Sequence, residues 1–379
     1  MSSRHLIDRV KALIYDVYVF IMTHGKEFLR WRKQASGGVG CRVFYGHDHI
    51  PSPGEKASGG IIKCQDLQKD FPNVVRGANV LYLVSSALPT CPEILVKYTK
   101  KSCVKLIVNQ NGVAFPAYHG NNLEKMNGPR RFLLQQADHV IYQSDYCKIS
   151  ADKYLTDTVE NYSILHNPVD VQFFLPAKKP ARPTKPVLLM AGSHGFFYRI
   201  SSAVQVLSSL KKLGIEAKLM IYGRLAWKND AEECRKELIA VCRKYGAEDM
   251  VEFGKSYRQI DAPSIYQSAD LLIHTQYNDA CPRTVVEAMA CGLPIVYSKS
   301  GGVPELVGEE AGRGVSVPMD WEKVHPPNPD QMAEAVVEVL SSIDQYATAA
   351  RERAVKRFDV RDWLEAHKKI FETVLGQDR

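Results

Sequence analysis

The segment from residue 278 to residue 305 gathers side chains whose types and spacing suit chemistry on a phosphate. Pro282 is typical of the first turn of a helix and Gly292 is typical of a helix end, so we expect a short helix between them. The free N–H groups of Arg283 and Thr284 would then lie at the positive end of the helix dipole. This segment therefore predicts a site for an anion such as a phosphate.

A carboxylate, Glu287, follows about one turn later on a helix that is otherwise apolar. A buried carboxylate needs hydrogen-bond donors, and the diol of a ribose can supply them. After the next predicted strand, Gly301 and Gly302 would let backbone approach a ligand closely, because glycine has no Cβ. These residues together favour a nucleotide diphosphate as the ligand.

The string EAMACGLPIV, followed by GGVPELV, resembles the donor-domain signature of the family 4 glycosyltransferases. The resemblance implies the GT-B fold, retention of the anomeric configuration, and dependence on a nucleotide sugar. That signature is normally a Glu-x7-Glu pair. Glu287 matches its second member, which binds the donor ribose in the family, and Asp279 holds the place of the first. The family residue hydrogen-bonds the transferred sugar near its anomeric carbon, and an aspartate reaches about 1.5 Å less far.

Weaker matches extend the resemblance through the second half of the chain. Arg199 falls where the family places a lysine against the diphosphate, and it follows a loop similar to the family's first donor-domain loop. An arginine there could grip phosphate oxygens and stabilise the leaving group, or it could be a solvated residue at a helix start. The loop and the turn that resembles the family's base-binding turn contain these further candidates: Gly192, Ser193, His194, Gly254, Lys255 and Ser256.

Two motifs in the first half resemble the acceptor-side loops of the family. Ser58, Gly59 and Gly60 look like the glycine loop that faces the donor phosphate and the acceptor. His119 lies after a predicted strand, where several relatives have a histidine near the sugar, although a surface position fits it equally well.

The pattern of strands and helices explains how these residues would come together. Apolar, β-branched runs alternate with helical patterns, which predicts parallel sheets covered on both faces. A proline-rich stretch interrupts the alternation, so we expect two doubly wound, Rossmann-like α/β domains that face a cleft. The expected division is a helical extension, an acceptor-side domain, a linker, a donor domain, and a C-terminal helix that crosses back, with these bounds: 1–40, 41–176, 177–186, 187–357 and 358–379.

The predicted strands in chain order are 42–45, 80–84, 104–108, 139–142, 162–165, 187–191, 218–222, 250–253, 271–274, 294–297 and 314–317. Helical patterns cover 60–69, 124–137, 200–213, 231–245, 283–291, 330–343 and 361–375.

Bulk composition excludes several classes of protein. The 379 residues carry a net charge of +7 without any dense basic block, which argues against nucleic acid as a partner. The nine cysteines are scattered and never spaced Cys-x-x-Cys, so a disulfide framework or a zinc site is not expected and a reducing cytoplasm is the default.

The first 35 residues contain an apolar run, residues 12–22, that is interrupted by Asp16 and is too short to span a membrane. Basic residues flank the run on both sides. This pattern fits an amphipathic helix in peripheral contact with an anionic membrane, and it also fits a helix packed on the protein itself or on a partner.

These observations predict a retaining glycosyltransferase that uses a UDP- or GDP-linked sugar and a glycan, lipid or other hydroxyl acceptor. No Asp-x-Asp string is present, so we expect no metal and no further cofactor. Asp279, His119 and Arg199 are the predicted catalytic residues. A non-catalytic nucleotide-sugar-binding subunit, or a GT-B epimerase or phosphorylase, is the alternative.

Overall fold

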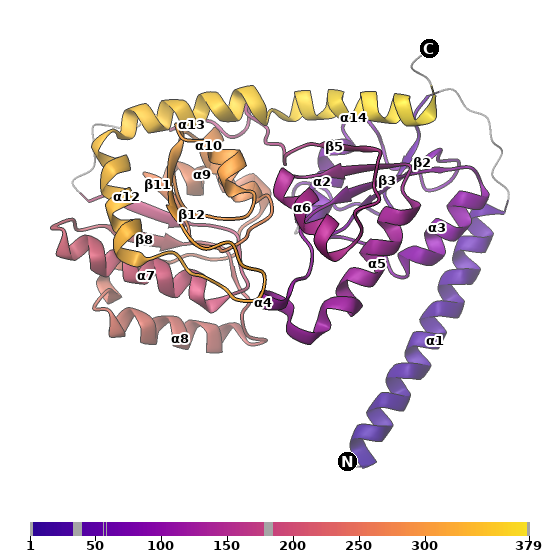
Figure 1. The fold of residues 1–379 in the computed structure, drawn as a ribbon, viewed down its shortest axis with the longest axis horizontal. Coiled ribbons are helices and arrows are strands. Elements are labelled where there is room, and N and C mark those ends of the chain that lie inside the picture. The colour runs from indigo at the N-terminus through magenta and orange to yellow at the C-terminus, as the bar shows by residue number, and fades with distance from the viewer. Residues whose placement is uncertain (1–2, 33–39, 56, 58, 178–184, 377–379) are drawn as a thin grey trace.

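Two parallel sheets, each covered by helices, form the body of the protein in the computed structural model (Figure 1). The structure describes residues 3–32, 40–55, 57, 59–177 and 185–376. Ser58 and most of the predicted linker lie outside the described residues. The predicted strands are all present, and their observed ends differ from the predicted ones by at most two residues.

The first sheet has the strand order β1-β2-β3-β4-β5 and every pairing in it is parallel. Its strands are β1 (Val43–Phe44), β2 (Val80–Val84), β3 (Lys105–Gln110), β4 (His139–Tyr142) and β5 (Tyr162–Ile164). The helices of this domain are α2 (Gly59–Leu67), α3 (Pro92–Lys101), α4 (Pro116–His119), η1 (Gly120–Asn122), α5 (Leu123–Gln136) and α6 (Asp145–Tyr154).

The second sheet has the order β10-β8-β6-β11-β12-β13, and a small parallel pair, β7-β9, lies beside it. Its strands are β6 (Val187–Met190), β7 (Ser193–His194), β8 (Lys218–Ile221), β9 (Arg224–Leu225), β10 (Val251–Phe253), β11 (Leu271–His274), β12 (Ile295–Lys299) and β13 (Gly312–Ser316). The accompanying helices are α7 (Phe197–Lys212), α8 (Ala231–Lys244), η2 (Glu248–Met250), η3 (Gln259–Asp261), α9 (Ala262–Gln267), α10 (Arg283–Ala290), α11 (Val303–Val307), α12 (Pro329–Ser341) and α13 (Ile343–Arg357).

Strand β11 shows why the sequence forms a doubly wound sheet here. It lies between β6 and β12, and all four of its residues are buried. A strand with helices on both faces must be apolar on both sides, which is why the run carries no alternation. Its C-terminal end therefore opens directly into the loop that carries Asp279.

Helix α14 (Val360–Leu375) continues from α13 along one edge of the molecule and connects the two domains (Figure 1). Trp363, Leu364 and Phe371 pack into the core of the first sheet. The buried His367 lies 2.9 Å from the hydroxyl of Tyr82 on β2. The last helix thereby ties the second domain to the first.

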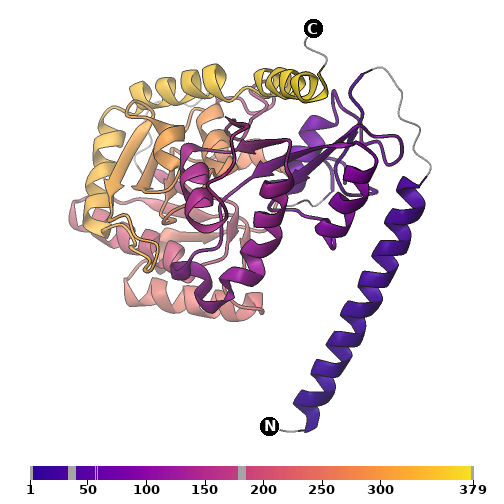
Figure 2. The same cartoon turned by 45° about the vertical axis from the view of Figure 1, so that its right-hand side comes forward.

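Helix α1 (Ser3–Trp31) projects away from the body of the protein, as both views show (Figures 1 and 2). Only its C-terminal part is docked, where Trp31 is 4% exposed and packs near Phe44, and His24 lies 3.2 Å from the hydroxyl of Tyr98. Within the described residues, no helix combines the length and the hydrophobicity that crossing a membrane requires.

Candidate functional site

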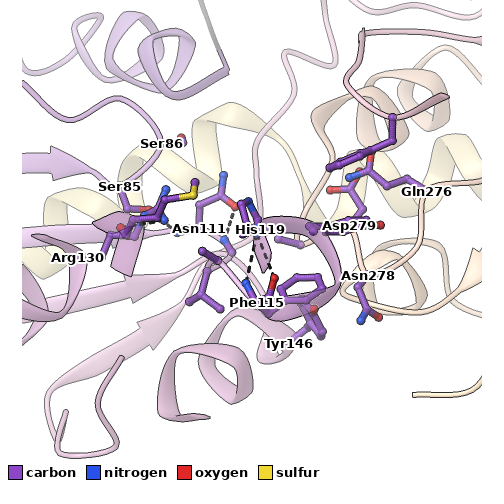
Figure 3. Close-up of a pocket in the computed structure, with 17 residues that line it drawn as sticks. Ser85, Ser86, Asn111, Phe115, His119, Arg130, Tyr146, Gln276, Asn278 and Asp279 are labelled. Atoms are coloured by element: carbon purple, nitrogen blue, oxygen red, sulfur yellow. Dashed lines mark hydrogen bonds between the residues drawn. The ribbon is translucent and has the colours of Figure 1, made fainter. Parts of the chain in front are cut away.

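A cavity of about 240 Å³ lies between the two domains and is lined by residues of both. The first domain contributes side chains from the loops after β2 and β3 and from α4, α5 and α6, while the second contributes the loops before α7 and after β11 (Figure 3). The lining includes Ser85, Asn111, His119, Arg130 and Tyr146 from the first domain and Phe196, Gln276, Asn278 and Asp279 from the second.

Asp279 lies on the cavity wall, directly after β11, and its side chain is 20% exposed. The Nε2 atom of His274, the last residue of β11, lies 3.1 Å from its carboxylate. Burial alone would raise the pKa of Asp279, but the contact with His274 and the charge of Arg199 outweigh burial and lower it. Burial also lowers the pKa of His274, which stays neutral near pH 7. Asp279 is therefore an ionised carboxylate in the cavity.

The glycine pair after β12 holds the loop of Asp279 in place. The Gly302 N–H donates to the carbonyl of Asp279 at 2.8 Å. A Cβ on Gly301 would lie 2.3 Å from that same carbonyl oxygen, and Gly301 has a φ of +65°. Both positions thus require glycine. The close backbone approach that was expected for a ligand is made to the loop of Asp279 instead.

Arg199 is 5% exposed, so its interpretation as a solvated residue at a helix start is wrong. It lies in the first turn of α7, and its Nη1 donates to the carbonyl of Ser193 at 2.9 Å. Its Nε is buried and has no hydrogen-bond partner among the described residues. Burial lowers the pKa of Arg199, and the nearby Asp279 opposes that effect. The guanidinium is therefore a partly unsatisfied cation behind the cavity wall.

Glu287 is 3% exposed and accepts hydrogen bonds on both carboxylate oxygens. Gln259 donates to one oxygen at 2.8 Å and the Tyr266 hydroxyl donates to the other at 2.9 Å. The protein thus supplies the donors that sequence analysis assigned to a ribose, and Glu287 is not among the residues that line the cavity. Gln259 and Tyr266 were missed because nothing in their local sequence indicates a contact with α10.

Helix α10 begins at Arg283, as predicted, with Pro282 at its N-cap and no side-chain cap. Arg283 reaches across the domain boundary to Asp66 on α2, with 2.9 Å between Nη1 and the carboxylate, and its Nε lies 3.5 Å from Glu287. The neighbouring Thr284 faces Gly192, where a Cβ would lie 3.0 Å from the threonine methyl carbon. The start of α10 therefore meets both the first domain and the loop after β6.

The remaining donor-side candidates surround that loop. His194 is fully buried, its Nε2 lies 3.1 Å from the Tyr222 carbonyl, and burial lowers its pKa to about 3. Ser193 is exposed, and its hydroxyl lies 3.4 Å from Arg224. Gly254 packs against the Tyr222 ring, whereas Lys255 and Ser256 are exposed.

The described first-domain candidates are Gly59, Gly60 and His119, and only His119 is among the residues that line the cavity. Gly59 begins α2, and Gly60 packs so closely that a Cβ would lie 2.7 Å from the Cβ of Ala87. His119 ends α4 and lines the cavity, with its Nδ1 3.3 Å from the Phe115 backbone. Burial, followed by the charge of Arg130, lowers the pKa of His119, so the ring is neutral near pH 7.

Aromatic side chains join the domains around the cavity. Trp321, in the loop after β13, stacks on Tyr146 at a ring distance of 5.4 Å, and its carbonyl accepts from the Ala117 N–H at 2.9 Å. The hydroxyls of Tyr118 and Tyr198 lie 2.6 Å apart across the boundary. Sequence patterns did not indicate these contacts, because an isolated aromatic residue in a loop carries no periodic signal.

Residues 171–357, which span the second domain, match the family model described as Glycosyl transferases group 1. The second domain is therefore similar to the glycosyltransferases of this family. The matched segment contains Asp279, Arg199 and the whole of α10, so the signature residues and the second-domain wall of the cavity lie within it.

Curated proteins match the chain over parts of their length. The gpi3 subunit of the phosphatidylinositol N-acetylglucosaminyltransferase of Schizosaccharomyces pombe is 20% identical over 253 residues, 65% of this chain and 51% of the relative. A D-inositol 3-phosphate glycosyltransferase of Salinispora tropica is 34% identical over 88 residues, 22% of this chain and 18% of the relative. Spore coat protein SA of Bacillus subtilis is 35% identical over 98 residues, 26% of this chain and 24% of the relative. The chain thus spans between about a fifth and about half of the length of these relatives.

Solved structures confirm the GT-B glycosyltransferase fold. Sucrose-phosphate synthase of Thermosynechococcus elongatus superposes with a TM-score of 0.64 at 16% identity, covering 83% of this chain and 77% of that one. Anabaena HepE in complex with UDP and glucose gives a TM-score of 0.61 at 18% identity, covering 78% of each chain. The expected pair of Rossmann-like domains facing a cleft is therefore present.

Proposed function

We propose that the protein is a retaining glycosyltransferase that moves a sugar from a nucleotide diphosphate to an acceptor hydroxyl. The observation that carries the proposal is Asp279, an ionised carboxylate on the wall of the interdomain cavity within the glycosyltransferase domain. Anabaena HepE, a neighbour of the same fold, has been solved with UDP-glucose. A UDP-linked sugar is accordingly the first donor to test, and a GDP-linked one the second.

The donor domain would hold the diphosphate with Arg199 and with the N-terminal N–H groups of α10. Arg199 has a buried Nε without a partner, which a phosphate oxygen could satisfy. The Arg283 and Thr284 N–H groups lie at the positive end of a helix that has no side-chain cap. A diphosphate there would be neutralised by protein groups, so we also propose that transfer needs no metal ion.

Asp279 would act on the sugar rather than on the phosphate. An ionised carboxylate near the anomeric carbon stabilises the positive charge that develops as the bond to the phosphate breaks. In a front-side reaction, the acceptor oxygen bonds to that carbon from the face that the diphosphate leaves. The hydroxyl proton then passes to the departing phosphate oxygen, so the products are the glycoside and the nucleoside diphosphate. His119 and Asn111 would orient the groups from the first-domain side of the cavity.

A panel of uridine, guanosine and adenosine diphosphate sugars tests the proposal without knowledge of the acceptor. One donor should raise the melting temperature and undergo slow hydrolysis that survives EDTA, because binding to the folded state alone stabilises it. Failure of every donor to bind would contradict the function, and loss of hydrolysis in EDTA would contradict its metal independence. Binding without turnover, even with cell extract as the acceptor source, would identify a nucleotide-sugar-binding subunit. Release of an epimerised donor or a free sugar phosphate would identify an epimerase or phosphorylase.

We further propose that α1 places the enzyme on the surface of an anionic membrane, in the cytoplasm, where lipid-linked as well as glycan acceptors are within reach. Ile14, Tyr18, Ile21 and Met22 are each more than half exposed, and at 100° per residue they share one face of the helix. The docked residues His24 and Trp31 lie on a different face. Seven basic and three acidic residues fall within positions 1–33, so four of the seven net positive charges of the chain lie there. This combination suits an anionic lipid surface better than an apolar partner.

Vesicle flotation tests the membrane contact. The full chain should float with vesicles that contain phosphatidylglycerol and not with pure phosphatidylcholine, and Ile14→Glu with Ile21→Glu should abolish flotation. Leu213→Glu, at an exposed apolar residue of the second domain, is the control that should leave it unchanged. Unaltered flotation of the double variant would contradict the proposal. Dimerisation in solution that this variant abolishes would instead point to a second copy on α1.

A further inference from the structure

Arg130 is a cation on the wall of the interdomain cavity without a partner that balances its charge. It lies on α5, its Nε is buried with no hydrogen-bond partner, and its Nη1 donates to the Met126 carbonyl of its own helix at 3.2 Å. Among the described residues, no carboxylate forms an ion pair with it. The adjacent Arg131 differs, because it pairs with Glu124 at 2.7 Å. Two consecutive arginines therefore have different surroundings, and only one of them faces the cavity.

An unbalanced guanidinium in a cavity indicates a ligand that brings the missing negative charge. An arginine stays protonated under all ordinary conditions, so burial cannot remove its charge. Burial lowers the pKa of Arg130, which is the sign of a charged form that has lost part of its hydration. A buried charge without a partner is unfavourable, and a phosphate or carboxylate that accepts two N–H bonds would compensate for that cost.

The position of Arg130 separates it from the groups proposed to hold the donor. In the close-up of the cavity, Arg130 lies with Ser85 and Asn111 on one side, and Asp279 lies on the other, with His119 between them (Figure 3). All of the proposed diphosphate contacts belong to the second domain, whereas Arg130 belongs to the first. An anion at Arg130 would therefore be carried by the second substrate.

We infer that Arg130 binds an anionic group, a phosphate or a carboxylate, on the acceptor. The inference rests on the proposed function and narrows its acceptor class from any hydroxyl compound to an anionic one. The acceptor would span the cavity, with its anionic group at Arg130 and its reacting hydroxyl directed toward the sugar beside Asp279. Arg130 touches the acceptor away from the reacting atoms, so its removal should weaken acceptor binding and leave donor binding intact.

Calorimetric titration of the full chain, saturated with UDP to fill the donor side, tests this site. Glucose 6-phosphate and glucuronate are the anionic probes, and glucose is the neutral one. At least one anionic probe should bind about tenfold more tightly than glucose. Arg130→Met, which keeps the apolar stem, should abolish that preference, and Arg130→Lys should retain part of it. Arg131→Met is the matched control and should leave the preference unchanged.

Several results of this titration would overturn the inference. Equal binding of charged and neutral probes, a preference that survives in Arg130→Met, or an equal loss in Arg131→Met would each do so. Melting curves exclude a merely structural role, because removing an unpaired charge should leave the melting temperature of Arg130→Met unchanged or raised. A fall of several degrees in Arg130→Met alone would show that Arg130 supports the fold instead. Absence of UDP binding to the wild type would contradict the proposed function, whereas normal UDP binding without an anionic preference would contradict this inference alone.

Discussion

The two domains face the same cavity with walls that are built differently. The second domain contributes a loop whose backbone is fixed by its neighbours. Asp279 follows a fully buried strand and contacts His274, and Gly301 and Gly302 pack against the backbone of its loop. The first domain presents side chains from several separate elements, among them Ser85, His119 and Arg130. A wall held rigid in this way suits a ligand whose chemistry is shared by a whole family, as we propose for the nucleotide sugar. A wall assembled from separate loops can change one position at a time, which suits an acceptor that differs between enzymes.

The largest expected effect is the loss of turnover when Asp279 is replaced. Replacing it by asparagine keeps its shape and removes the charge beside the anomeric carbon, so turnover of the identified donor should fall about 100- to 1,000-fold. His119→Asn, on the opposite wall, should reduce turnover only about tenfold. Initial rates at saturating donor, with UDP affinity measured in parallel, compare the two walls. An equal loss of turnover in the two variants would mean that the two walls of the cavity do not differ in their contribution to catalysis.

Replacing Trp321 should have the second largest effect, because Trp321 connects the two domains beside the cavity. Trp321→Ala removes the stacking on Tyr146, and the free energy of unfolding should fall by about 2 kcal/mol, less than for a fully buried tryptophan. Hydrolysis of the donor should rise relative to transfer, because a looser boundary admits water. Urea unfolding followed by circular dichroism measures the first effect. Trp227→Ala, which loses a contact within the second domain only, should leave the ratio of hydrolysis to transfer unchanged.

Glu287 should have a smaller effect, confined to the donor side. Glu287→Gln removes the charge beside Arg283 at the start of α10, where the diphosphate is proposed to bind. UDP should therefore bind about tenfold more weakly. Isothermal titration with UDP gives this number. Binding of the anionic probes proposed for Arg130 should not change. Full UDP affinity in this variant would show that Glu287 is a structural carboxylate.

The smallest expected effect is a dependence of the stability on pH. A buried histidine in each domain contributes to it. Burial lowers the pKa of His367 in the first-domain core to about 4 and that of His194 in the second domain to about 3. Between these values and about 6.5, the ordinary pKa, the unfolded chain binds protons that the folded chain does not. Stability is therefore complete above about pH 6.5 and falls as the pH drops below it.

Between pH 7.5 and 5.5, each histidine should account for about 1 kcal/mol of that loss. Urea midpoints at the two pH values measure it. His367→Gln should reduce the pH dependence by about 1 kcal/mol. His194 and the other histidines whose pKa burial lowers, among them His274, should account for the remainder. An unchanged dependence in His367→Gln would mean that other groups dominate.

Local patterns along the chain predicted the strands and several of the helices of this protein. The strands and α10 follow from runs of apolar residues with proline and glycine at their ends. The start of α12 shows the same logic, because the Asn328 side chain accepts from the Asp330 and Gln331 N–H groups just as a cap is expected to do. The family signature placed Asp279 correctly at the cavity, since it lies within one contiguous segment.

Contacts between distant segments could not be predicted in this way. Nothing in the sequence around Arg130 distinguishes it from Arg131. Only the packing of α5 against the cavity leaves Arg130 with a buried Nε that has no hydrogen-bond partner in the described part of the chain. The partners of Glu287 come from η3 and α9, and the partner of Arg283 comes from α2, 217 residues away.

The sequence by itself therefore determined the alternation of elements, the fold class and the segment that carries Asp279, because these depend on neighbours along the chain. The tertiary structure alone decided which charges stay unbalanced, which carboxylate is already occupied, and which aromatic residues join the domains. Electrostatic and packing energies depend on distance in space and on local hydration, and folding brings together residues whose separation along the chain gives no warning of contact.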